Sequence, residues 1–214
     1  MKGTKVFYIA LFFALIVILY GCNGRNSRGY LEDRIGNQIS RVYPTKNLED
    51  LFEQFPNGFT IYQSYQLEDR FIDIQLDGVE KGKPIEGTIK QINRKSGAEE
   101  KKIEVKYDSG KFSYDNEEEA RKLWPIEKFL FQEMTLNKEI LSKLKLKDTY
   151  YNGNNGSFEI EYVVKNEQIN EFLGLEKKQK VKLGLHGSNA NKRYYYTLSV
   201  KLDSGFTFRE RIEE

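Results

Sequence analysis

The fold is decided by one stretch, Ile72-Asp73-Ile74-Gln75-Leu76-Asp77-Gly78, in which apolar and polar residues alternate strictly until a turn dipeptide ends the run. Successive side chains of a strand point to opposite faces, so this pattern is typical of a strand with one buried face and one solvated face. Asp77-Gly78 has the residue types that tight turns favour. We therefore predict half-buried antiparallel strands.

The same period of two recurs on both sides of this stretch. Ser96-Gly97, Ser109-Gly110 and Ser204-Gly205 supply further turns. The remaining predicted strands have their apolar positions at Phe59, Ile61 and Tyr65; at Ile103, Val105 and Tyr107; within 111–114; at Phe158, Ile160, Tyr162 and Val164; at Val181, Leu183 and Leu185; at Tyr194, Tyr196, Leu198, Val200 and Leu202; and at Phe206 and Phe208.

Three short helices are predicted between the strands. The first follows Tyr43-Pro44-Thr45, with Thr45 or Asn47 as its N-cap, and carries a helical stripe of Leu48, Leu51, Phe52 and Phe55. The others cover 136–146 and 167–173, the last being closed by Gly174. The order helix, strands, helix, strands predicts an α+β fold of antiparallel β-meanders with a few short helices packed against the sheet, and leaves a loose duplication open.

The N-terminus carries a targeting signal. Lys2 and Lys5 precede the 15-residue apolar run 6–20, and small Gly21 precedes Cys22, the only cysteine of the chain. Fifteen residues suit a signal-peptide core and fall short of the ~20 that a spanning helix needs. We interpret the segment as a lipoprotein signal cleaved between Gly21 and Cys22, with Cys22 as the lipidated residue. An uncleaved anchor helix and an ordinary secretory signal are the alternatives.

This interpretation divides the chain into three parts. Residues 1–21 are the signal peptide, 22–40 are a flexible polar tether, and 41–214 are a single α+β domain with 41–116 and 126–214 as candidate halves. A chain of this length can build a proper core without disulfides, and the 14 Tyr and 14 Phe supply bulky material for it.

From the balance of charges we expect no nucleic-acid partner. The whole chain has 34 basic and 32 acidic residues, and loss of Lys2 and Lys5 leaves 32 of each. A mature protein without net charge has no general attraction to nucleic acid or to anionic lipid. Its membrane attachment would come from the lipid.

Catalytic, cofactor and metal sites are not expected. His186 is the only histidine and falls on the polar side of its predicted strand, whereas a zinc site or a nucleophile with its base needs several such residues. A hydrolase would require Asp73, Asp77, Glu159 and Glu161 to converge in one cleft. We interpret these carboxylates instead as a solvated charged face.

Two further motifs are interpreted structurally. Gly153-Asn154-Asn155-Gly156 lacks the Lys and Ser/Thr of a phosphate-binding loop and is predicted as a hairpin tip. In Tyr194-Tyr195-Tyr196, alternation places the outer two rings in the core and leaves only Tyr195 outside.

The chain resembles the staphylococcal tandem-type lipoproteins, a family of paralogous conserved antigens. The resemblance rests on the lipobox at Cys22, on Tyr43-Pro44-Thr45-Lys46-Asn47-Leu48-Glu49-Asp50-Leu51, on 87–94 with its Ile92-Asn93-Arg94, on Phe129-Leu130-Phe131, and on 157–162 and 183–187. It implies a surface-exposed, membrane-anchored antigen without known catalysis, some members of the family being linked to host-cell entry and to recognition by innate immunity. Cys22 is the one functional residue that carries over.

The expected function is that of a non-enzymatic lipoprotein on the extracytoplasmic face of the cell membrane, acting as an antigen or interaction module. Its partners would be the membrane, through the lipid anchor, and a host or envelope protein; no cofactor and no small-molecule ligand are expected. The alternative is a carrier of a small molecule or lipid, whose sheet would enclose an apolar pocket of several hundred Å³.

Overall fold

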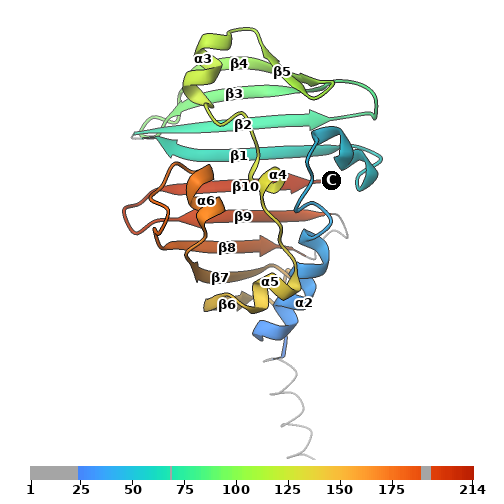
Figure 1. Cartoon of the computed structure of the whole chain (residues 1–214), viewed down its shortest axis with the longest axis vertical. Coiled ribbons are helices and arrows are strands. Elements are labelled where there is room, and N and C mark those ends of the chain that lie inside the picture. Colours follow the sequence, from blue (N-terminus) through green and yellow to red (C-terminus); the bar gives the residue numbers. More distant parts are fainter. Residues whose placement is uncertain (1–23, 68, 189–193) are drawn as a thin grey trace, which may run out of the picture.

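The computed structural model describes residues 24–67, 69–188 and 194–214, which build one sheet of ten antiparallel strands in the order β5-β4-β3-β2-β1-β10-β9-β8-β7-β6 (Figure 1). The strands are β1 (Phe59–Leu67), β2 (Arg70–Gly78), β3 (Ile85–Asn93), β4 (Glu99–Asp108), β5 (Lys111–Tyr114), β6 (Lys145–Tyr151), β7 (Phe158–Val164), β8 (Val181–Gly187), β9 (Tyr195–Lys201) and β10 (Thr207–Glu213). The first five strands and the last five are each a meander.

The two meanders join in the middle of the sheet. The chain enters at the centre with β1, runs outward to β5, crosses beneath the sheet to the opposite edge, and returns inward from β6 to β10. β1 and β10 then pair over six residues each, from Thr60 opposite Glu213 to Tyr65 opposite Phe208. We call this pairing the seam. It makes the candidate halves parts of one sheet.

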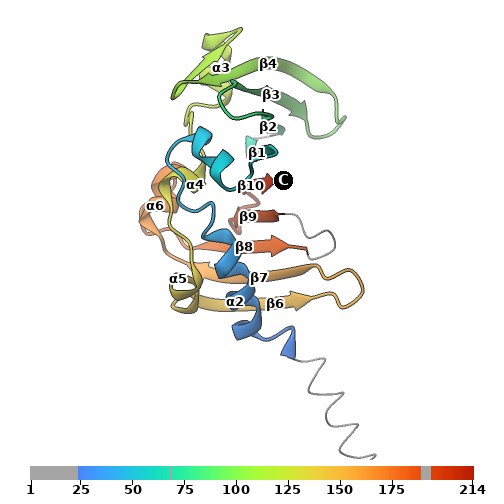
Figure 2. The same ribbon diagram turned by 90° about the vertical axis from the view of Figure 1, so that its right-hand side faces the viewer.

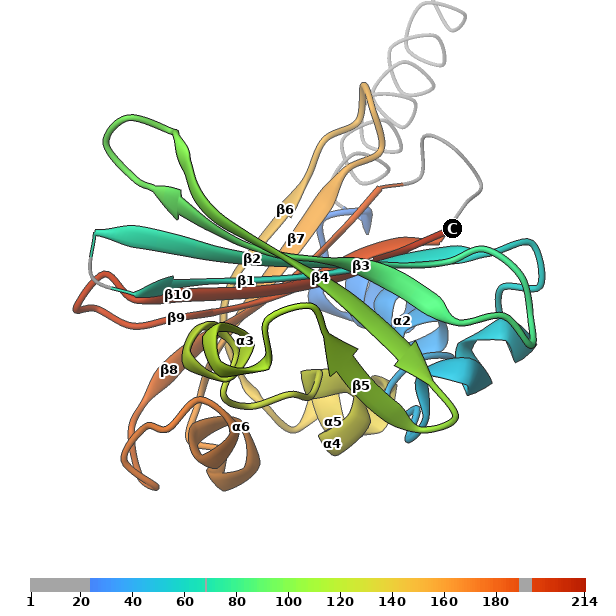
Figure 3. The ribbon, with the colours of Figure 1, turned by 90° about the horizontal axis from the view of Figure 1, so that it is seen from above.

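Every described helix lies on the same face of the sheet (Figures 2 and 3). These helices are α2 (Arg28–Ile39), the 3₁₀ helix η1 (Leu48–Glu53), α3 (Glu117–Leu123), α4 (Leu130–Glu133), α5 (Lys138–Ser142) and α6 (Glu167–Phe172). The core fills the space between this face and the helices, and its largest fully buried side chains include Trp124, Tyr162, Phe55, Phe129, Phe131, Phe158 and Phe208. The opposite face is left uncovered by helices.

The predicted antiparallel meanders with a few short helices are confirmed. The proportions are 41% strand and 22% helix, and the sheet is not closed, so the fold is β-rich rather than clearly α+β.

The strand directions do not fit a simple duplication. Antiparallel pairing along the sheet makes β1 and β6 run in opposite directions, although each begins its half. A shift along the sheet would preserve strand direction, and a half-turn about the sheet normal would reverse the order of the strands. Neither operation superimposes the two halves.

The prediction of a flexible tether over 22–40 is wrong for most of the residues that the structure describes there, because Arg28–Ile39 is helical. The Ser27 side chain accepts a hydrogen bond from the Tyr30 N–H and so caps the helix. Leu31, Ile35 and Ile39 are buried and recur every four residues, which gives α2 one apolar stripe. The stripe is narrow, yet it suffices because α2 packs on α5 and β7.

The N-terminal part of α2 is also held by polar contacts. The Arg28 guanidinium donates to the carbonyl oxygens of Leu141, Ser142 and Leu144 at 3.2, 2.7 and 3.0 Å, at the end of α5. It also pairs with buried Glu32 at 2.7 Å, which accepts a hydrogen bond from the Tyr162 hydroxyl at 3.0 Å. The folded domain therefore begins at about residue 27.

Three other local predictions need adjustment. The stripe Leu48, Leu51, Phe52 and Phe55 is buried as predicted, but its helix is 3₁₀, and Asn47 stands at the N-cap position without a side-chain capping bond. The helix predicted over 136–146 covers only Lys138–Ser142, and β6 begins at Lys145. Strand β3 was not predicted.

A buried carboxylate lies under the seam. Glu210 of β10 is fully buried and accepts hydrogen bonds from the N–H groups of Leu130 and Phe131 at 2.6 and 2.9 Å, from the Tyr43 hydroxyl at 2.8 Å, and from the Gln63 amide at 3.2 Å. Burial raises the pKa of Glu210 to about 7, against the lowering effect of these donors. Glu210 thus connects both halves of the sheet to the segment that crosses from β5 to β6.

No helix described between residues 24 and 214 has the length and apolar character needed to cross a bilayer.

Candidate functional site

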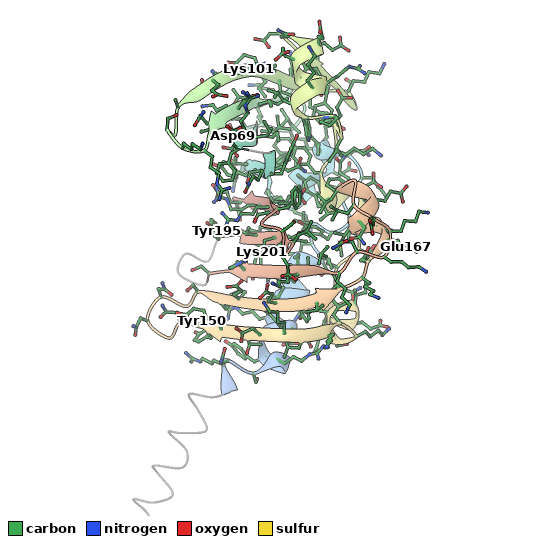
Figure 4. The ribbon with its side chains drawn as sticks, turned by 90° about the vertical axis from the view of Figure 1, so that its left-hand side faces the viewer. Asp69, Lys101, Tyr150, Glu167, Tyr195 and Lys201 are labelled. Carbon is green, nitrogen blue, oxygen red and sulfur yellow. The ribbon has the colours of Figure 1, made fainter. Side chains whose placement is uncertain are left out.

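The uncovered face of the sheet carries polar side chains over its whole width. β7 shows the pattern, with Phe158, Ile160 and Tyr162 buried toward the helices and Glu159 and Glu161 directed to the other side. In the side-chain view, Tyr150 and Tyr195 lie on this open face, whereas Glu167 of α6 lies on the helix side (Figure 4). Tyr195 is 39% exposed and Tyr150 is 54% exposed.

A hollow of about 490 Å³ lies on this face over strands β6 to β10. Hydroxyl, charged and aromatic side chains make up most of its lining. The lining residues are Tyr150, Ser157, Phe158, Glu159, His186, Gly187, Ser188, Tyr195, Thr197, Ser199, Lys201, Arg209 and Arg211. We call this site the open-face hollow.

Small residues in neighbouring strands help to form the hollow. Arg209 of β10 stands between Ser64 of β1 and Ser199 of β9, and Ser199 in turn faces Gly184 of β8. A Cβ at Gly184 would come within 2.6 Å of the Ser199 Oγ, so the position accepts no side chain without movement. The exposed Arg209 side chain therefore has only small side chains beside it on both adjacent strands.

Arg211 is held between two aromatic rings. Its guanidinium carbon lies 4.0 Å from the centre of the Tyr62 ring and 5.3 Å from that of Tyr195. It donates to the Tyr195 hydroxyl at 3.2 Å, and its Nε lies 3.3 Å from a Glu213 carboxylate oxygen without alignment for a hydrogen bond. Such cation–π contacts fix the side chain and leave its charge at the surface.

His186 and Glu159 form a pair at the other side of the hollow. The His186 Nε2 lies 3.0 Å from a Glu159 carboxylate oxygen, and the Lys201 ammonium lies 4.0 Å from the same oxygen. Partial burial lowers the pKa of His186, Glu159 raises it, and Lys201 and Arg209 lower it further. The imidazole is therefore mostly neutral at pH 7.

The sequence-predicted site residues fall in different places. Gly21 and Cys22 lie outside the described residues. His186 is on the polar side of β8, as predicted, and Tyr194 and Tyr196 are buried while Tyr195 is outside. The predicted hairpin tip joins β6 to β7, closed by a bond from the Asn152 N–H to the Ser157 carbonyl at 2.8 Å.

The four carboxylates of the hydrolase hypothesis are not brought together. Asp73 and Asp77 are on β2, whereas Glu159 and Glu161 are on β7, with β1, β10, β9 and β8 between these strands. Five strand spacings of about 4.8 Å separate the two pairs by about 24 Å. Asp77 accepts hydrogen bonds from Thr60 and Gln75 at 2.7 and 3.0 Å.

Sequence reasoning missed the cations of the hollow. Arg209 and Arg211 alternate with buried Phe208, Glu210 and Ile212, so period-two alternation could have placed them on the open face. Their approach to Lys201 and His186 could not be foreseen, because it depends on β10, β9 and β8 being neighbours in this register.

Among residues 24–67, 69–188 and 194–214, no three His, Cys, Asp or Glu side chains are grouped as a metal site would require. No known family model matches the chain, and no curated protein matches it significantly.

Proposed function

We propose that this chain is a non-enzymatic lipoprotein, held by acyl chains on Cys22 at the extracytoplasmic face of the cell membrane, with the uncovered face of its sheet as the interaction surface. One observation carries this proposal: every described helix is on one face of the sheet, and the other face carries mainly polar and aromatic side chains (Figures 2 and 4). This role is that of the staphylococcal tandem-type lipoproteins, which the sequence resembles. The partner would be a host or envelope protein.

The composition of the open face supports this role. Tyr and Arg are enriched at the centres of protein interfaces, where they supply rigid contact area and directed hydrogen bonds. Tyr62, Tyr195 and Arg211 form such a group already ordered before any partner arrives. A pre-ordered surface loses less conformational entropy on binding.

The anchor would lie close to the domain. Cys22 is six residues before Arg28, where α2 begins, so the chain between them spans at most about 21 Å. α2 lies at the β6 end of the molecule (Figure 1). The β6 end would therefore face the membrane, with the open-face hollow in the membrane-proximal half.

The carrier alternative calls for an apolar pocket inside the sheet. The open-face hollow has a charged and hydroxyl-bearing lining instead, and a hollow of about 510 Å³ beside α4 and α6 is lined mostly by charged and amide side chains. The space between the sheet and the helices is filled by buried aromatic and aliphatic side chains. These observations favour an interaction surface.

The test is the intact mass of the protein extracted from membranes, measured for wild type, Cys22→Ser and Asn37→Ser. Asn37 lies on the exposed side of α2 and gives a control outside the signal. We expect wild type and the control to show the chain from Cys22 plus a diacylglyceryl group, and Cys22→Ser to lack it. A wild-type mass equal to the full unmodified chain would sink the lipoprotein proposal.

A further inference from the structure

Arg209 differs from the other charged side chains of the open-face hollow in its contacts. It is exposed, and within the part of the chain that the structure describes its side chain makes no hydrogen bond or ion pair. We propose that the open-face hollow binds an acidic segment of a partner protein, with Arg209 and Lys201 contacting its carboxylates. This inference rests on the proposed function, because it assigns a chemistry to the partner of the open face.

The charges of the lining support an acidic ligand. Three permanent cations, Lys201, Arg209 and Arg211, face a single carboxylate, Glu159. The excess is local, because the chain from Cys22 onward has 32 basic and 32 acidic residues. A cationic patch on a neutral protein attracts acidic partners through charge complementarity.

The existing contacts pair two of these cations with carboxylates and leave Arg209 uncompensated. Glu159 lies 3.0 Å from His186 and 4.0 Å from Lys201, and Glu213 lies 3.3 Å from Arg211. Neither carboxylate is paired with Arg209. Lys201 and Arg209 line the same hollow, and both lower the pKa of His186.

The shape of the hollow favours a peptide segment over a small anion. The hollow opens on the sheet face and is bordered by two exposed rings, Tyr150 from β6 and Tyr195 from β9. The planar fork of Arg209 can bind a carboxylate through two parallel hydrogen bonds, while the rings contact the aliphatic parts of neighbouring side chains. Thr197 adds a partly exposed hydroxyl group for the peptide backbone.

The experiment uses the lipidated mature protein in detergent and a fluorescein-labelled hexaglutamate peptide, with binding measured by fluorescence anisotropy at low salt. We expect binding that weakens as salt is added and that weakens at least tenfold in Arg209→Ala/Lys201→Ala. Hexalysine should not bind. Arg209→Lys, which keeps the charge but not the fork, should lose less affinity than Arg209→Ala.

The matched control is Lys90→Ala/Lys102→Ala, which removes two cations from the same face in the other half of the sheet. These lysines are paired with Glu99 and Glu104 at 2.9 and 2.6 Å. We expect this variant to bind hexaglutamate within about twofold of wild type, since exposed charges far from a site are screened. Equal melting temperatures of the two double variants would confirm that both fold.

Three results would overturn the inference: equal losses in the two double variants, no loss in Arg209→Ala/Lys201→Ala, or binding of a sulfated oligosaccharide that depends on Arg209 while hexaglutamate does not bind. The intact mass of the protein is independent of Arg209. Failure of hexaglutamate binding in a correctly lipidated protein would therefore remove this inference and leave the lipoprotein proposal intact.

Discussion

Glu210 shows how one residue can connect distant parts of this chain. Its four donors come from the loop before η1, from β1 and from the segment that opens α4. Gln63 extends the network, since it accepts from the Trp124 indole at 2.8 Å and donates to the Lys128 carbonyl at 3.2 Å. A buried network of this kind is stabilising only while its members are satisfied.

The raised pKa of Glu210 gives stability a specific pH dependence. The folded-state pKa is about 7 against 4.5 for the free side chain, so the folded state binds more protons between these values. The contribution of Glu210 to the free energy of unfolding therefore falls as pH rises from about 4.5 to about 7, by an amount on the order of 3 kcal/mol. Glu210→Gln removes the titrating group, so we expect the free energy of unfolding of wild type to fall relative to that of Glu210→Gln as pH rises over that interval.

Urea unfolding of both proteins at several pH values between 4 and 8 measures this difference. Glu86→Gln is the control, because Glu86 is exposed and its ion pair with Lys106 is 4.0 Å long. We expect the control to follow the wild-type profile. Parallel profiles for wild type and Glu210→Gln would contradict the role given to Glu210.

At the scale of elements, α2 is part of the domain core. Ile35 is fully buried in its stripe, whereas Asn37 is exposed two residues later. We expect Ile35→Ala to lower the free energy of unfolding by about 2–4 kcal/mol, because it leaves a cavity, and Asn37→Ala to change it by less than about 0.5 kcal/mol. Denaturant unfolding of the two variants gives the comparison.

Equal and small effects of these substitutions would mean that α2 is not packed on the domain. A second consequence follows for a chain that begins at Ser40. It lacks the whole of α2 and leaves the α5 and β7 surfaces uncovered, so it should be less stable than a chain that begins at Asn26, just before the Ser27 cap.

An element could be predicted from the sequence where its apolar residues recur at a regular spacing. β2, β7 and β9 have uninterrupted alternation and were predicted, whereas β3 places Gly87 and Gln91 at helix-side positions and was missed. Gly87 stands there because a Cβ would lie 1.8 Å from the Gln75 carbonyl oxygen of β2. The sequence of β3 alone does not reveal that a carbonyl group of β2 lies so close. α2 was missed because its stripe has only three residues, Leu31, Ile35 and Ile39, in a helix of twelve.

The same limit applies to the open-face hollow. Alternation predicted the outward position of His186 and Tyr195, since that depends on a single strand. The grouping of Arg209, Lys201 and Glu159 depends on the order and register of four strands, β7 to β10. Only the tertiary structure supplies that information.

At the scale of the whole molecule, the seam makes the two meanders one cooperative unit. Neither 41–116 nor 126–214 contains both β1 and β10, and Glu210 draws donors from both segments. We therefore expect each segment alone to be unfolded, and the complete domain to unfold in one transition seen equally by far-ultraviolet circular dichroism and by Trp124 fluorescence. A folded isolated half, or two separate transitions, would contradict this expectation.

The position of β10 also determines when the domain can be finished during its synthesis. β10 is the last strand in chain order, yet it lies in the centre of the sheet between β1 and β9. Until residues 207–213 have emerged, both neighbours present unpaired backbone groups, which are templates for pairing with other chains. A chain truncated before residue 207 would therefore keep two open strand edges in the middle of its sheet and be prone to aggregation, however well its first nine strands have formed.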